Sequence, residues 1–169
     1  MSDSVAEVMI TFDAEGIIDR YGKQTNPDPK KPQDINYSYI YMVTRSKNAF
    51  SGNGGGNLAL QVRTGEFIRW RENSPTYSYQ AILCNFTVSS GADLLGPMQQ
   101  SRIEINYAMP NMKDPTAKPT ETQKVKVYSW RTEAQLEGTA SYVFTVMLLD
   151  RDGNVVGYYK WDPTIQIRA

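Results

Sequence analysis

The sequence contains no histidine and has no excess of charge, and both shortages exclude classes of function. Without histidine the chain lacks the usual general base, the Ser-His and Cys-His nucleophile pairs and the commonest zinc ligand. Its 18 basic side chains balance 18 acidic ones, so there is no basic footprint for nucleic acid or an anionic membrane. We therefore expect no catalytic residues, metal or cofactor, and no nucleic-acid partner.

Cysteine and long apolar runs are also scarce. Cys84 is the only cysteine, so no intramolecular disulfide can form and the fold does not depend on an oxidising compartment. It alternates in phase with Ile82 and Phe86, which favours a small buried side chain over a reactive thiol. The longest apolar stretch, around Tyr142–Leu149, is too short for a membrane span, and no signal peptide is recognisable. We expect a cytoplasmic protein without membrane insertion.

What the sequence does contain is apolar residues at every second position, the period of a strand with one buried face. The pattern begins with Ala6, Val8, Ile10 and Phe12, which predicts that this face of the first strand is buried. Further strands are predicted at residues 39–44, 58–62, 67–71, 81–89, 102–107, 124–132, 141–149, 155–161 and 164–167.

Helical periodicity is nearly absent from the chain. Single helical turns are expected at most at residues 91–95 and 133–136, and residues 14–16 are interpreted as a break after the first strand. Glycine and proline fall mostly between the strands, as turn residues should. The pattern predicts a single all-β domain over residues 1–169. Its expected form is an antiparallel β-sandwich, jelly-roll or immunoglobulin-like, with few or no helices.

The clearest hairpin joins residues 142–149 to residues 155–159 through Asp150–Asn154. The tip resembles the beginning of a calcium loop, but the closing Glu of such a loop is missing. A polar turn is the favoured interpretation, and cation binding at the tip is left open.

Aromatic side chains supply the candidate ligand contacts. Trp70, Trp130 and Trp161 could stack against a sugar ring, with Asp28 and Asn36 binding its hydroxyl groups. Sandwich cores use the same aromatic residues, so a structural role for each tryptophan is the favoured alternative. Two proline-containing loops, residues 25–36 and 109–122, are the places where such contacts would be sought.

Three segments form a set in the same order along the chain. The first, near the N-terminus, comprises Ile17–Tyr21, Asn26–Pro32, Ile35–Asn36 and Tyr39–Val43, the second is Gly65–Arg71, and the third is Gly157–Ile165. Together they resemble the signatures of the bacterial inclusion body protein family typified by PixA and AidA, over nearly the whole chain, while residues 109–122 depart from the pattern. The resemblance implies a small cytoplasmic protein that accumulates in inclusions, and it brings no catalytic mechanism or active-site residue.

Two hypotheses of function follow. The first is a non-enzymatic protein that self-associates as a homodimer or a higher assembly, because a neutral molecule lacks long-range repulsion and exposed strand edges can pair. The alternative is a carbohydrate-binding module, lectin-like, that uses the aromatic and Asn/Asp side chains named above.

Overall fold

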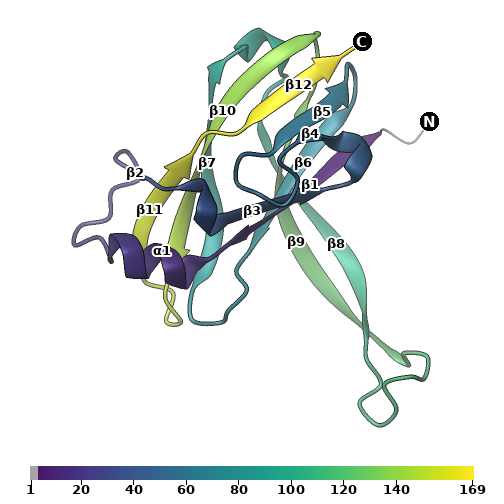
Figure 1. Cartoon of the computed structure of the whole chain (residues 1–169). Coiled ribbons are helices and arrows are strands. Elements are labelled where there is room, and N and C mark those ends of the chain that lie inside the picture. Colours follow the sequence, from purple (N-terminus) through teal and green to yellow (C-terminus); the bar gives the residue numbers. More distant parts are fainter. Residues whose placement is uncertain (1–3) are drawn as a thin grey trace.

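The computed structural model describes residues 4–169, which form two mixed β-sheets around one hydrophobic core (Figure 1). The first sheet contains β1 (Val5–Phe12), β3 (Ile40–Thr44), β6 (Phe67–Asn73), β8 (Gln99–Met109) and β9 (Glu121–Glu133), in the order β3-β1-β6-β9-β8. The second contains β2 (Gln33–Asp34), β4 (Ala49–Ser51), β5 (Ala59–Arg63), β7 (Gln80–Ser90), β10 (Gly138–Leu149), β11 (Val155–Trp161) and β12 (Thr164–Arg168). Its order is β2-β11-β10-β12-β5-β4, and β7 also pairs with β10.

The prediction of a purely antiparallel arrangement was wrong. The β10–β11 hairpin is antiparallel as predicted, but β1 pairs with β6, β12 with β5, and β2 with β11 in parallel. Parallel partners need a crossover and are distant in sequence, so local alternation carries no information about them. The jelly-roll and immunoglobulin-like alternatives stay predictions.

Inward-facing aromatic side chains join the two sheets. The even face of β1 is fully buried, which confirms the predicted alternation. Across the core, the ring of Trp70 lies 5.5 Å from that of Tyr142 and 5.4 Å from that of Phe144, and Phe12 lies 5.2 Å from Trp161. These edge-on and tilted contacts bury the largest side chains of both sheets against one another.

An α-helix, α1 (Ala14–Tyr21), replaces the break predicted at residues 14–16. The carboxylate of Asp13 accepts a hydrogen bond from the Gly16 amide at 2.9 Å and so caps the N-terminus. A Cβ at Gly16 would lie 2.4 Å from that carboxylate, so glycine is needed there. Gly22, with φ +75°, ends the helix. Asp13, Gly22 and Arg20 in the last turn were local signals of this helix, whereas Gly16 within it argued against one.

The other helical segments are single 3₁₀ turns at Tyr37–Tyr39, Ser46–Asn48 and Ala92–Leu94. The last confirms the turn expected at 91–95. The turn expected at 133–136 was wrong, because Glu133 still belongs to β9 and Ala134 forms a bridge with Leu95. None of the helices in residues 4–169 is long and apolar enough to cross a membrane.

A β-bulge in β7 overturns the predicted alternation around Cys84. Leu83 pairs with Val146 and Asn85 with Thr145, so Cys84 is an extra residue between two register positions. The extra residue changes which side chains of β7 face the core. Before the bulge, Leu83 is buried, while Ile82 is 38% exposed. Cys84 itself is only partly buried, and burial raises the pKa of its thiol, which agrees with an unreactive side chain.

Candidate functional site

The three candidate tryptophans lie in or beside the core. Trp70 is 0% and Trp161 2% exposed, so neither presents a face on which a sugar ring could stack. Trp130 is the register partner of Trp70 on β9 and is partly buried. Its indole N–H donates to the carbonyl of Leu83 at 2.8 Å, which joins β9 to β7.

The two candidate polar residues hold turns of the loop between α1 and β3. The carboxylate of Asp28 accepts from the Lys30 amide, and the side-chain oxygen of Asn36 accepts from the Ser38 amide, each at 2.9 Å. No hydrogen bond within residues 4–169 joins either of them to the three tryptophans. Ligand binding by these five residues therefore stays a prediction.

The Asp150–Asn154 tip is closed by its own hydrogen bonds. One oxygen of Asp150 accepts from the amides of Asp152 and Asn154, and the other accepts from the Asn154 side chain. These donors, the Asn154 amide first, lower the pKa of the Asp150 carboxyl. No group of three or more potential metal ligands is found within the described part of the chain. The tip has the geometry of a polar turn.

The signature segment Gly65–Arg71 builds the turn into β6 and the packing beneath it. Gly65 has φ +85°, which favours glycine. The Arg69 guanidinium pairs with Glu7 on β1 at 2.8 Å, and Trp70 fills the core. The features of this motif therefore have structural roles.

The signature segment at the C-terminal end also positions strands. A Cβ at Gly157 would lie 2.6 Å from the hydroxyl oxygen of Tyr159, which donates to the Gly22 carbonyl at 2.9 Å. The Tyr37 hydroxyl donates to Asp162 at 2.5 Å, and this bond, with partial burial and the negative charge, raises the pKa of Tyr37 to about 12. This contact ties the β11–β12 junction to the loop before β3.

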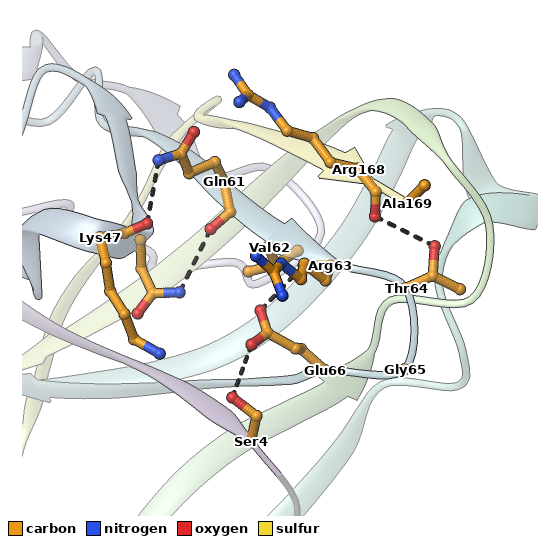
Figure 2. Close-up of a pocket in the computed structure, with 11 residues that line it drawn as sticks. Ser4, Lys47, Gln61, Val62, Arg63, Thr64, Gly65, Glu66, Arg168 and Ala169 are labelled. Carbon is orange, nitrogen blue, oxygen red and sulfur yellow. Dashed lines mark hydrogen bonds between the residues drawn. The ribbon is translucent and has the colours of Figure 1, made fainter.

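An open polar pocket of about 770 Å³ lies where β5, β12 and the turn before β6 meet (Figure 2). Glu66 is held there by the Ser4 hydroxyl at 2.6 Å and by the Arg63 amide at 2.9 Å. Lys47 and Arg168 also line the pocket, so its lining contains both donors and acceptors. We call this the polar pocket.

Two observations describe the electrostatics of the polar pocket. Burial would raise the pKa of Glu66, but the two hydrogen bonds and the charges of Lys47 and Arg63 lower it overall. Asn48 also lines the pocket and is 3% exposed, and its side-chain oxygen has no hydrogen-bond partner. The pocket therefore offers both hydrogen-bond donors, from Lys47, Arg63 and Arg168, and the acceptor oxygens of Glu66 to a polar ligand.

The second feature is a long hairpin that projects from the rest of the molecule (Figure 1). β9 pairs with β6 only as far as Trp130, and from there to Glu121 it pairs only with β8. We call residues 99–129 the arm, and the remaining described residues the body. Among the described strands, β8 pairs only with β9, so the outer edge of the arm is unpaired.

One face of the arm is apolar and the other is polar. The register places Ile103 opposite Val127 and Ile105 opposite Val125. Residues on this face continue at every second position of β8 to the tip. The apolar face consists of the partly buried Ile103, Ile105, Val125 and Val127 and of Tyr107 and Met109, which are 52% and 40% exposed. Toward the tip, Gln123 and Glu121 share this face as the register partners of Tyr107 and Met109. The opposite face carries the Glu104–Lys124 ion pair at 3.2 Å. Sequence alternation predicted both strands. It did not predict that, among the described strands, no third one pairs with this hairpin beyond Trp130.

Comparisons with known proteins agree with one another. The sequence profile of the PixA family, described as inclusion body protein, matches residues 4–167. The crystal structure of an inclusion body protein from Burkholderia cenocepacia J2315 is similar at a TM-score of 0.81 and 17% identity, over 99% of this chain and 98% of that one. At this identity the likeness shows a shared fold.

Another solved structure is much less similar. A cysteine protease inhibitor from Entamoeba histolytica gives a TM-score of 0.32 at 12% identity, over 65% of this chain and 86% of that one. A likeness at this level carries no argument. Comparison with curated proteins gives no match.

Proposed function

This chain belongs to the PixA family of inclusion body proteins, and from that premise we propose that it is a non-enzymatic, cytoplasmic protein that self-associates through the arm. The observation that carries the proposal is the apolar face of the arm, on which Tyr107 and Met109 are exposed and beside which no third strand of the described residues pairs beyond Trp130.

An isolated two-stranded hairpin is marginal in water, and a third strand or a packed face is needed for independent stability. In the arm, β9 continues for about nine residues beyond its last pair with β6. Its Ile and Val side chains form cross-strand pairs with one another and are only partly buried. The tip adds Met112, which is 88% exposed. Covering this face would stabilise the arm, so we infer that it is an interface.

A second copy of the chain is the partner that fits best. Two arms related by a two-fold axis present identical apolar faces to each other, which is the symmetry of most homodimers. The chain has no net charge to oppose this approach. The free edge of β8 offers a second contact, because its unpaired backbone groups could join copies into larger assemblies.

Sedimentation equilibrium over a range of concentrations tests the proposal with two matched variants of one strand. Ile105→Lys places a charge on the apolar face, whereas Asn106→Lys places the same charge on the polar face one residue away. We expect Ile105→Lys to weaken association roughly 10-fold or more, because it removes about 1.5–3 kcal/mol of apolar burial. Asn106→Lys should change it little. A monomeric parent, or equal effects of the two variants, would contradict the proposal.

A second candidate function is carbohydrate binding at the polar pocket. The polar lining favours it, because sugar hydroxyl groups can donate to the Glu66 carboxylate and accept from Lys47 or Arg63. No aromatic side chain lines the pocket, so recognition would depend on hydrogen bonds.

A glycan array followed by saturation-transfer NMR would test this candidate. Binding should weaken in Lys47→Ala, which removes a pocket ammonium, and remain in Lys113→Ala, which removes one from the tip of the arm. The absence of binding to every glycan, or equal loss in both variants, would refute it.

A further inference from the structure

A second, smaller pocket lies at the root of the arm. Its volume is about 240 Å³, and it opens where β9 leaves β6. It is lined by Glu72 from β6, by Ile82 and Leu83 from β7, and by Gln100, Tyr128 and Trp130 from β8 and β9. We call it the root pocket.

The strand register explains why a carboxylate lies in this pocket. Glu72 follows Trp70 by two residues, so both side chains are on the inner face of β6. The pairing of β6 with β9 stops at Trp70 and Trp130, so no β9 residue pairs with Glu72. Tyr128 is two residues from Trp130 on β9, and Gln100 is the register partner of Trp130 on β8. Tyr128 and Gln100 therefore share the inner face with Trp130. The open corner thus brings one carboxylate together with two aromatic rings.

Glu72 has no ion-pair partner among the described residues. None of the ion pairs within residues 4–169 includes it, although Glu7, on the opposite face of the sheet, pairs with both Arg69 and Arg71. From β1 the register partner of Glu72 is the buried Ile10. From the other elements, Tyr128 is the only further ionisable side chain in the lining. A half-buried carboxylate among apolar groups is costly when ionised unless a cation accompanies it.

We propose that the root pocket binds a small organic cation, with its ammonium group against the Glu72 carboxylate and its apolar body against Trp130 and Ile82. The aromatic rings of Trp130 and Tyr128 favour the same charge, because their faces attract cations. The volume is below the ~300–1,000 Å³ usual for drug-sized ligands, so the ligand is smaller than these. The pocket uses the inner face of the arm, so the proposal is independent of association through the apolar face.

The ionisation of Glu72 adds a pH dependence to this binding. Burial raises the pKa of Glu72 to about 7, and amide groups of Leu83 and of Glu72 itself offset part of the rise. A cation that binds the carboxylate therefore binds well above that pH and poorly below it.

Benzylammonium, benzyl alcohol and benzoate provide probes of nearly equal shape and different charge. A change in tryptophan fluorescence would report binding, because Trp130 lines the root pocket whereas the other two tryptophans are buried in the core. We expect saturable binding of benzylammonium at pH 8, at least ~10-fold tighter than that of the alcohol, and no binding of benzoate. Between pH 8 and pH 5.5 the affinity for benzylammonium should fall roughly 10-fold or more, while the affinity for the alcohol stays constant.

Two matched variants complete the test. Glu72→Gln keeps the size of the side chain and should remove the preference for benzylammonium, whereas Glu121→Gln, an exposed carboxylate on the same sheet, should retain it. Equal affinities for the cation and the alcohol in the parent protein would overturn the proposal, whatever the variants do. A preference that survives Glu72→Gln, or no saturable binding of benzylammonium, would also overturn it.

Discussion

The body and the arm are built from the same kind of alternating strand, but they differ in what covers the apolar face. In the body, Trp70 and Phe12 pack against aromatic side chains of the opposite sheet. In the arm, Ile103 and Ile105 lie opposite Val127 and Val125 of the neighbouring strand and are only partly buried. The same local pattern builds a core where a second layer is present, whereas in the arm it leaves an apolar face that we propose as an interface.

The largest expected effect is in the body. Trp70→Ala should lower the free energy of unfolding by about 3–5 kcal/mol, because it leaves a cavity between the two sheets. Urea denaturation followed by circular dichroism would measure it. The control is Tyr77→Ala, a 96% exposed aromatic whose loss should cost less than ~0.5 kcal/mol. Similar losses in the two variants would mean that the core is misassigned.

At the boundary between body and arm, Glu72→Gln should stabilise the protein at pH 8. The pKa of Glu72 is raised from 4.5 to about 7 in the folded chain, so the unfolded chain releases this proton first as pH rises. The resulting penalty on folding is absent below about pH 4.5 and complete above about pH 7. We expect a gain of the order of 1–3 kcal/mol at pH 8 and nearly none at pH 4, measured by denaturation at both pH values. A gain that does not depend on pH would contradict this account.

A smaller effect is expected for Tyr37→Phe, which removes the hydrogen bond to Asp162 while keeping the ring. Both side chains are exposed, so the loss should be about 0.5–1 kcal/mol at pH 7. Thermal unfolding would detect it, and Tyr41→Phe, at another exposed tyrosine, is the control. A cost of several kcal/mol would show that the β11–β12 junction depends on this bond.

The smallest effect on stability is expected in the arm. Ile105→Lys should change the unfolding free energy of the monomer by less than ~0.5 kcal/mol, because the side chain contributes nothing to the core of the body. Chemical denaturation at a concentration below association would measure this. A loss comparable with that of Trp70→Ala would mean that the arm belongs to the core.

Much of the strand content could be predicted from local sequence, and the reasons for the failures are physical. Period-two runs located β1 and the β10–β11 hairpin correctly. The parallel pairing of β1 with β6 is a long-range choice that no local pattern contains. The eight residues of α1 are too few to show a clear period, so capping by Asp13 and packing decide that helix.

The candidate site was less predictable than the fold. A one-residue bulge at Cys84 reversed the buried face of β7, and no local signal marks it. Glu72 reads as an ordinary solvated carboxylate in the sequence, because its burial arises from the point where β9 leaves β6. The tryptophans were predicted as ligand contacts because their rings can stack on a sugar, whereas two of the three are buried in the core.

The most direct measurement compares sedimentation of the full chain with that of a chain in which residues 103–127 are replaced by Asn-Gly. This two-residue turn suits the antiparallel register of Arg102 with Tyr128 and leaves the body intact. The account predicts a concentration-dependent assembly for the full chain and a folded monomer for the shortened one. The shortened chain should show the thermal unfolding of the full chain measured at a concentration below association. Equal assembly of both chains, or a full chain that stays monomeric at high concentration, would contradict it.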